Sequence, residues 1–354
     1  MPLQFMIDIE GTELSEIECE LLTQANVGAV ILFTRNFING KQLQKLVTDI
    51  KEINPDLFIA TDHEGGNVQR FQRRGFSSIP AARAYGKVYD KDQQIGLEFA
   101  QEYGEIMAND LLVHGVNLSL APILDLHNQC SIIAGLDRAF HHHPDAIIDL
   151  ASAFIQGMNK AGMPAVGKHF PGHGSVNSDS HISMPVSKAS LEELMANDLK
   201  PFIELIKKGL LPALMPAHVT YEAIDKENPA GFSSTWLKTI LRTQLKFQGL
   251  ILSDCLSMKG ADIGDLNTRA QRALSAGCDM LIVCHQPRKL LLDLVQNQAI
   301  EHNPESVKRI AAFKKLMSQS KTALCSPSSF FEEKPSKVKN TTRNDEELNK
   351  TLTI

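Results

Sequence analysis

Short, almost continuously apolar runs alternate with longer amphipathic segments along most of this 354-residue chain, and this alternation constrains the fold most strongly. A strand of a parallel sheet that is covered by helices on both faces has such an apolar sequence. The runs that predict buried strands are 3–8, 28–33, 57–62, 116–122, 164–169, 212–217, 249–253 and 279–284. Segments with helical patterns between them include 41–53, 92–113, 145–161, 190–208 and 235–246. Ser190 and Glu193 have the spacing of a capping box at the start of one helix.

The alternation predicts a single-domain α/β fold, a (β/α)8 barrel over residues 1–318. An open doubly wound sheet is the alternative, but no GxGxxG follows the first strand, and polar residues stand at the ends of many strands. Beyond about residue 320 the chain is polar, charged and interrupted by proline. We therefore expect 319–354 to be a polar C-terminal tail with little fixed structure, although Phe330 and Phe331 could dock on the barrel.

Composition and charge argue against several classes of partner. With 43% hydrophobic and 22% charged residues, the chain has the composition of a soluble globular protein. Its formal charge of -5 gives no reason to expect nucleic acid or an anionic membrane as a partner. The N-terminus lacks the basic region and apolar core of a signal peptide, and no apolar run approaches the roughly 18 residues of a membrane span. We expect a cytoplasmic protein and a monomer.

The cysteines are scattered along the chain and form no CxxC pair, so we expect reduced thiols rather than a disulfide framework. They are Cys19, Cys130, Cys255, Cys278, Cys284 and Cys325.

One loop concentrates titratable side chains. The segment 168–174 (KHFPGHG) is followed by 179–181 (DSH), which together place one Lys, three His and one Asp within fourteen residues. Its proline and two glycines disfavour a regular helix or strand. Such a loop, ending in an Asp-x-His pair, indicates a mobile active-site element in which Asp179 tunes His181.

Polar residues also follow the carboxyl ends of five successive expected strands. They are Asp62, His63 and Glu64, then Asp125, then Lys168 and His169, then His218, and finally Asp254. Because the carboxyl ends of barrel strands meet at one mouth, we expect these side chains to converge there. Taken singly, Asp125 fits a structural role, and His173 and His218 fit core histidines.

In its motifs the chain resembles glycoside hydrolase family 3, in the single-domain bacterial β-N-acetylhexosaminidase branch. The blocks that carry this resemblance are TDHEGGNVQRF (61–71), VNLSLAPILDL (116–126), DRAF (137–140), GKHFPGHGSVNSDSHISMP (167–185), MPAHVTY (215–221) and FQGLILSDCLSMKGA (247–261). Weaker likeness at 27–36 and 276–283 extends the match over nearly the whole expected barrel. The KHFPGHG block with a downstream DSH is the most specific of these signals.

Cleavage of a glycosidic bond with retention needs a carboxylate that attacks the anomeric carbon and an acid that protonates the leaving oxygen. Asp254, at the end of a strand that faces the mouth, is the best nucleophile candidate and matches the family nucleophile. A structural cap of the next helix is its alternative role. The resemblance assigns the acid–base role to His181, paired with Asp179. A plain turn is the alternative reading of that segment, because Asp and Ser favour turns.

The resemblance further implies that Asp62, Arg70, Arg138, Lys168 and His169 bind the non-reducing N-acetylglucosamine. For Arg70, an ion pair with Glu64 is an alternative of nearly equal weight. The implied activity is exo-acting and retaining, requires no cofactor or metal, and removes N-acetylglucosamine from anhydro-muropeptides during peptidoglycan recycling. That role would connect the enzyme to cell wall biogenesis, cell shape and cell division.

The sequence departs from the family pattern at several positions. His63, Asn67, Ser175 and Cys255 replace a common Gln, Arg, Asp and Asp, respectively, and His141–His143 fill a turn that is usually rich in glycine. None of these changes removes a proposed catalytic group. The lost charges at 67 and 255 leave the contacts beyond the terminal sugar open.

Three other functions are disfavoured by the sequence. A metal-dependent hydrolase on the same fold is disfavoured because the histidines have no common zinc-ligand spacing. A non-catalytic sugar-binding protein would be expected to lack Asp254 or His181, and both are present. A β-glucosidase or another glycosidase of the same family is disfavoured by the KHFPGH loop and the lack of a second domain.

Overall fold

The computed structural model of the protein describes residues 3–176, 185–297 and 303–319. The chain divides into two compact units, Met1–Ser320 and Lys321–Ile354, and all described residues lie in the first unit.

The described residues contain a ring of eight parallel strands. They are β1 (Phe5–Asp8), β2 (Val27–Leu32), β3 (Phe58–Thr61), β6 (Leu118–Ser119), β7 (Val166–Phe170), β9 (Ala213–Pro216), β12 (Leu250–Ile251) and β13 (Leu281–Val283). One sheet has the order β13-β1-β2-β3-β6, and another has the order β12-β9-β7. Isolated parallel bridges, Ile123 to Lys168 and Leu252 to Met280, join the two sheets at both edges. Neighbours in the ring are therefore neighbours in sequence, which confirms the predicted (β/α)8 barrel and rules out the open sheet.

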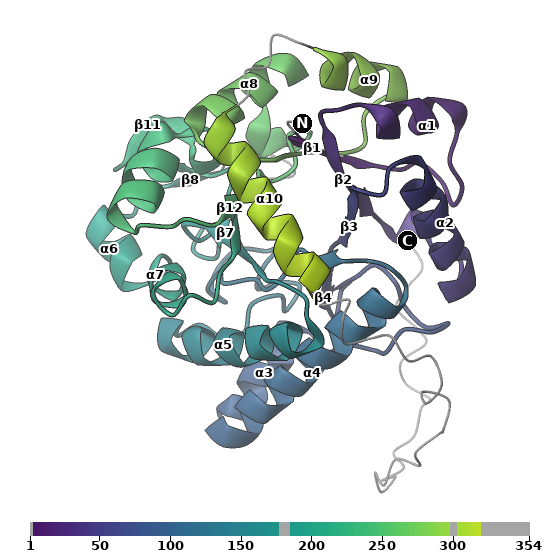
Figure 1. Cartoon of the computed structure of the whole chain (residues 1–354). Helices are drawn as coiled ribbons and strands as arrows, with labels where there is room; N and C mark the ends of the chain where they lie inside the picture. The colour runs from purple at the N-terminus through teal and green to yellow at the C-terminus, as the bar shows by residue number, and fades with distance from the viewer. Residues whose placement is uncertain (1–2, 177–184, 298–302, 320–354) are drawn as a thin grey trace, which may run out of the picture. The chain divides into compact units, whose positions relative to one another are not determined.

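Helices follow the strands and surround them (Figure 1). They are α1 (Glu16–Thr23), α2 (Gly40–Ile53), α3 (Ala82–Tyr89), α4 (Gln93–Val113), α5 (Pro144–Ala161), α6 (Leu191–Ala196), α7 (Lys200–Lys207), η3 (Thr235–Gln244), α8 (Leu266–Ala276), α9 (Arg288–Gln296) and α10 (Pro304–Gln319). Side-chain caps fix several helix starts. Asn39 accepts a hydrogen bond from the Gln42 backbone N–H at α2, and the predicted capping box of Ser190 and Glu193 is confirmed at α6.

Two predicted helices differ from the expectation. The segment 190–208 forms two helices instead of one, because the chain breaks between α6 and α7 and Pro201 stands in the first turn of α7. A proline is tolerated there, since the first backbone N–H groups of a helix have no partner within the helix. The segment 235–246 is helical, but it is wound as a π-helix, with the Leu245 N–H donating to the Ile240 carbonyl.

Short strands outside the barrel follow β3, β7 and β9. The antiparallel pair β4 (His63–Gly65) and β5 (Val68–Gln69) follows β3 directly, and β8 (Val186–Ser187), β10 (Thr220–Tyr221) and β11 (Asp225–Pro229) form a small separate sheet. Three 3₁₀ turns complete the described elements: η1 (Thr34–Asn36), η2 (Ala230–Phe232) and η4 (Lys259–Ala261). Gly65 and Gly66 have φ of 104° and 55°, a region that glycine adopts without steric cost.

Side chains of alternate strand residues fill the barrel interior. The cluster consists of Met6, Ala29, Ile31, Phe58, Ala60, Leu118, Leu120, Val166, Ala213, Met215, Leu250, Leu252, Met280, Ile282 and Cys284, together with Ile310, Phe313 and Met317 of α10. Phe313 packs edge-on against Phe58 at the start of β3, with ring centroids 6.3 Å apart. Helix α10 therefore closes the end of the barrel where the strands begin, and Figure 1 shows it lying across the ring of strands. Helix α10 does not cover the opposite end, where the strands finish.

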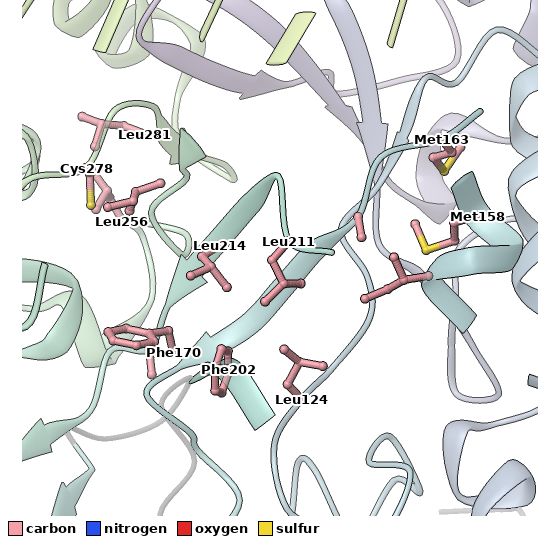
Figure 2. Close-up of a cluster of buried hydrophobic side chains, with 14 of the residues drawn as sticks. Leu124, Met158, Met163, Phe170, Phe202, Leu211, Leu214, Leu256, Cys278 and Leu281 are labelled. Atoms are coloured by element: carbon pink, nitrogen blue, oxygen red, sulfur yellow. The ribbon is translucent and has the colours of Figure 1, made fainter. Parts of the chain in front are cut away.

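A second apolar layer lies between the strands and the helices that surround them. Figure 2 shows part of this layer, where Leu214 of β9 and Phe170 of β7 gather near Phe202 of α7. The rings of Phe170 and Phe202 meet edge to face at a centroid distance of 5.6 Å. Packing of this kind holds the end of β7 rigidly, and β7 is the strand from which the histidine-rich loop begins.

Candidate active site

The same alternation that fills the barrel interior carries two carboxylates to its mouth. Phe58 and Ala60 of β3 point into the barrel, and Asp62 is the next residue in phase with them. Leu250 and Leu252 point inward in the same way before Asp254. Because strand side chains alternate with a period of two, the positions that continue the inward rows beyond the apolar interior face the mouth.

Strand β7 brings two residues to the mouth instead of one. Its register with β9 shifts between Lys168 and Phe170, so the strand bulges at His169. Both Lys168 and His169 border the cavity as a result.

A cavity of about 560 Å³ occupies the mouth of the barrel. Among the residues that line it are the predicted Asp62, Arg70, Arg138, Lys168, His169 and Asp254. Apolar side chains of Ile31, Leu120, Met215 and Ile282 form part of the wall, and Phe33 and Met258 also contribute. A concave site with an apolar wall and a few converging polar groups is typical of a small-molecule site.

An ion-pair network fixes the polar side of this cavity. The Lys168 Nζ lies 3.0 Å from Asp62 Oδ1 and 2.6 Å from Glu64 Oε1. Arg138 donates to both oxygens of Glu64, at 2.9 and 2.8 Å, and Arg70 donates to Asp62 Oδ2 at 3.3 Å. Three cations thus surround two carboxylates, and the side chains restrain one another.

Burial and charge act in opposite directions on these groups. Burial alone would raise the pKa of Asp62, but the charges of Lys168 and Arg70 outweigh it and hold that pKa well below its usual range. The pKa of Glu64 is lowered in the same way by Arg138 and Lys168. Burial would lower the pKa of Lys168, but the two carboxylates raise it. All three groups are therefore charged at neutral pH.

Asp125 holds the start of the histidine-rich loop by hydrogen bonds. Its side chain is fully buried and accepts hydrogen bonds from the backbone N–H groups of His169 and His173, at 3.1 and 2.8 Å. It also accepts from His169 Nδ1 at 2.7 Å. Burial would raise the pKa of Asp125, but His169 and His173 lower it, so the carboxylate is ionised and orients the His169 ring. This geometry matches the structural role weighed for Asp125.

Two histidines expected at the mouth do not line the cavity. His63 is out of phase with Asp62, is fully buried and packs beside Phe71 and Phe76. Burial and Arg70 lower its pKa to about 3, so it is neutral. His218 is buried against Phe232, with ring centroids 5.1 Å apart, which fits the core histidine weighed above. The expectation that all the polar strand-end residues line the cavity was therefore wrong for His63, Glu64, Asp125 and His218.

Some contributors to the site were not predicted. Glu64 was expected near the mouth but without a role, and it is the residue that links Lys168 to Arg138. It does not pair with Arg70, which contacts Asp62 instead. Phe33 and His285 line the cavity from the ends of β2 and β13, and their position directly after buried strands was the signal that could have indicated them.

Asp179 and His181 lie outside the described residues, and the structure therefore does not place them. Within the described ranges no group of three or more His, Cys, Asp or Glu side chains is arranged to hold a metal ion. None of the helices in the described part of the chain is long and apolar enough to cross a membrane.

A parallel (β/α)8 barrel with a charged cavity at the carboxyl ends of its strands has the architecture of a barrel enzyme. The chain belongs to glycosyl hydrolase family 3, whose N-terminal domain matches residues 4–313, and it is a glycoside hydrolase. This confirms the family resemblance seen in the motifs. A β-hexosaminidase of Thioalkalivibrio sulfidiphilus is 48% identical over 310 residues, which cover 86% of this chain and 87% of that protein.

Solved structures agree with this assignment. NagZ from Neisseria gonorrhoeae in complex with N-trifluoroacetyl-D-glucosamine aligns with a TM-score of 0.80 and 39% identity, over 90% of this chain and 96% of that one. A structure of the same bacterial protein with a zinc ion aligns with a TM-score of 0.80 and 40% identity, over 89% of this chain and 92% of that one.

Proposed function

We propose that the protein is an exo-acting, retaining β-N-acetylglucosaminidase that removes the non-reducing terminal sugar by double displacement. One observation carries the proposal: a fixed array of charged hydrogen-bonding groups and the carboxylate of Asp254 border the same cavity. The β-hexosaminidase relatives and the N-acylglucosamine bound to the gonococcal neighbour support an acetamido sugar as the substrate.

The sugar hydroxyls bind to the more exposed members of the ion-pair network. The side chains of Asp62 and Arg70 are 21% and 30% exposed, whereas those of Lys168 and Glu64 are 2% and 6% exposed. Asp62 and Arg70 therefore offer an acceptor and donors to adjacent hydroxyl groups, and Lys168 and Glu64 hold them in place. The hydrogen bond between His169 Nδ1 and Asp125 Oδ2, at 2.7 Å, holds the His169 ring in the cavity wall, where it can contact the sugar.

Asp254 attacks the anomeric carbon and forms a covalent glycosyl-enzyme. It follows β12 and the bridge of Leu252 to Met280, so the barrel holds the backbone that precedes it. Its Oδ1 accepts a hydrogen bond from the Cys255 N–H at 2.7 Å. One oxygen is thereby oriented by the main chain, and the carboxylate reaches the reaction without a large conformational cost.

His181 protonates the leaving oxygen and then activates the water that releases the sugar, and Asp179 sets the tautomer of its ring. The support for these two roles is the family membership and the DSH motif after KHFPGHG. An imidazole with an ordinary pKa near 6.5 can donate and accept a proton at neutral pH.

The proposed substrate is an N-acetylglucosamine-terminated peptidoglycan fragment, an anhydro-muropeptide, and the proposed location is the cytoplasm. The similarity to the gonococcal NagZ neighbour, over 90% of this chain and 96% of that one, supports this role in peptidoglycan recycling.

Hydrolysis of an aryl β-N-acetylglucosaminide, compared with the matching β-glucoside, tests the proposal. The assay is run with and without EDTA, on the wild type and on Asp254→Ala. We expect chelator-resistant release from the acetamido sugar that is lost in the variant. Faster release from the glucoside would assign another glycosidase activity, and inhibition by EDTA would overturn the metal-independent mechanism.

A further inference from the structure

Two cysteine side chains meet at the wall of the cavity. Cys255 follows β12 and Cys284 follows β13, and these strands are neighbours in the ring. Leu252 pairs with Met280, and further along the Leu256 N–H donates to the Ile282 carbonyl at 2.9 Å. This register brings the ends of both strands together, and both cysteines line the cavity.

The two thiols lie close enough to influence each other. Both are free, and both side chains stand on the same wall of the cavity. Cys255 is partly exposed to the cavity, whereas Cys284 is 1% exposed. Of the two, Cys255 is therefore the thiol that a small molecule in the cavity reaches first.

The surroundings also favour reaction at Cys255. The hydrogen bond from Cys284 lowers the pKa of the Cys255 thiol, and the backbone N–H of Ser257 lowers it further, although burial opposes both. The same contact, together with burial, raises the pKa of Cys284 well above its usual value. A thiolate is the reactive form of cysteine, so one member of the pair is the nucleophile and its neighbour carries the proton.

We propose that Cys255 and Cys284 form an oxidation site that hydrogen peroxide converts to a disulfide within the active-site cavity. The Cys255 thiolate attacks one peroxide oxygen, the O–O bond breaks, and a sulfenic acid and hydroxide result. The Cys284 sulfur then attacks the sulfenic sulfur, loses its proton and displaces hydroxide, which leaves as water. The two thiols lose two electrons, one peroxide becomes two waters, and a dithiol reductant reverses the change.

The disulfide would disturb the position of Asp254. The Cys255 N–H holds Asp254 Oδ1 at 2.7 Å, so a change in the Cys255 backbone is passed directly to that carboxylate. The Cys284 carbonyl accepts from Ser257 Oγ at 2.7 Å, and Gln286 Nε2 donates to the same hydroxyl at 3.0 Å. A covalent bond brings the two sulfurs closer together. Its formation therefore displaces the backbone at Cys255 and at Cys284.

Peptide mapping and activity after peroxide treatment test the proposal on the full chain. We expect a reducible peptide that links Cys255 to Cys284, an accompanying fall in activity of at least about tenfold, and recovery with dithiothreitol. Cys255→Ser and Cys284→Ser, each compared with its own untreated form, should lose both the link and the reversible inactivation. Cys19→Ser, a change on helix α1, serves as the matched control and should behave like the wild type.

Absence of the linked peptide from peroxide-treated wild type would overturn the oxidation site, whether or not the serine variants fold. A linked peptide with unchanged activity would overturn the effect on Asp254. The mapping does not depend on the proposed function, since it reads the disulfide directly even if the acetamido sugar proves to be the wrong substrate.

Discussion

A single buried residue, Lys168, positions two carboxylates of the site and balances their charge. Its side chain is 2% exposed, and its Nζ contacts Asp62 and Glu64 together. A buried cation between two carboxylates restrains both. Its removal leaves buried negative charge, which among the described residues Arg70 and Arg138 then have to compensate.

Lys168→Met should therefore lower the free energy of unfolding by about 3–5 kcal/mol, because it breaks a buried ion-pair network. It should also raise KM more than tenfold, since Asp62 loses the partner that holds it in place. Lys160→Met is the matched control: Lys160 pairs with Glu105 at 2.7 Å, but its side chain is 63% exposed. We expect less than about 1 kcal/mol for the control. Equal losses in urea unfolding would contradict the proposed role of burial.

His181→Ala should impair poor leaving groups far more than good ones, because only poor leaving groups need protonation. General acid–base help is worth roughly 10² to 10⁴ in rate, so the loss on an alkyl glycoside should lie in that range. Asp179→Ala should give the same pattern in a milder form. A series of aryl glycosides with different leaving-group pKa values measures this, and a loss of equal size on every substrate would argue against the acid role.

At the scale of secondary-structure elements, the break between α6 and α7 anchors the start of the histidine-rich loop. Asp198, which is 4% exposed, accepts hydrogen bonds from Ser175 Oγ at 2.8 and 2.9 Å. Tyr221 of β10 donates its hydroxyl proton to the Gly172 carbonyl at 2.6 Å. Burial raises the pKa of Asp198 to about 6, although Ser175 opposes this shift.

This shift predicts a pH-dependent stability. Between the ordinary aspartate pKa of 3.8, which applies to the unfolded chain, and the folded pKa of about 6, the folded state binds the proton that the unfolded state has lost. The free energy of unfolding should therefore fall as pH rises through this window, by about 3 kcal/mol at about 1.4 kcal/mol per pKa unit. Asp198→Asn should remove that part of the slope, whereas Asp145→Asn, on the exposed surface of α5, should not. Identical slopes for wild type and Asp198→Asn in chemical unfolding would contradict the burial argument.

Helix α10 should contribute stability without contributing to catalysis, because it covers the end of the barrel opposite the cavity. Phe313→Ala removes a 2% exposed ring from the barrel interior and should lower the free energy of unfolding by about 3–5 kcal/mol, with kcat nearly unchanged in the folded fraction. Lys308→Ala, at an exposed position of the same helix, should change stability by less than about 0.5 kcal/mol. A large fall in kcat for Phe313→Ala at full folding would show that the two ends are coupled.

The sequence predicts the strands of this protein well because each of them is buried on both faces. Each of the eight apolar runs overlaps a strand of the ring, within the residues described. Local backbone geometry is harder to predict from the sequence. The break before Pro201 and the bulge at His169 depend on tertiary contacts. For the site, residue type identified the polar positions, but the phase along each strand decided which of them face the cavity. His63 directly follows Asp62 and is buried outside the cavity for that reason.

At the scale of the molecule, the barrel separates stability from function. One end is filled by α10, the middle by alternating apolar side chains, and the other end by the charged cavity. We propose that the catalytic unit ends near residue 318 and that 319–354 forms a separate tail, in line with a family match that ends at 313.

Asp254 should form a covalent bond with the sugar. The most direct test is the mass of the protein after incubation with a fluorinated N-acetylglucosamine derivative whose glycosyl-enzyme hydrolyses slowly, followed by peptide mapping. We expect one added sugar per chain, located on Asp254 and absent from Asp254→Ala. A sugar on another residue, or continued turnover by Asp254→Ala, would contradict it.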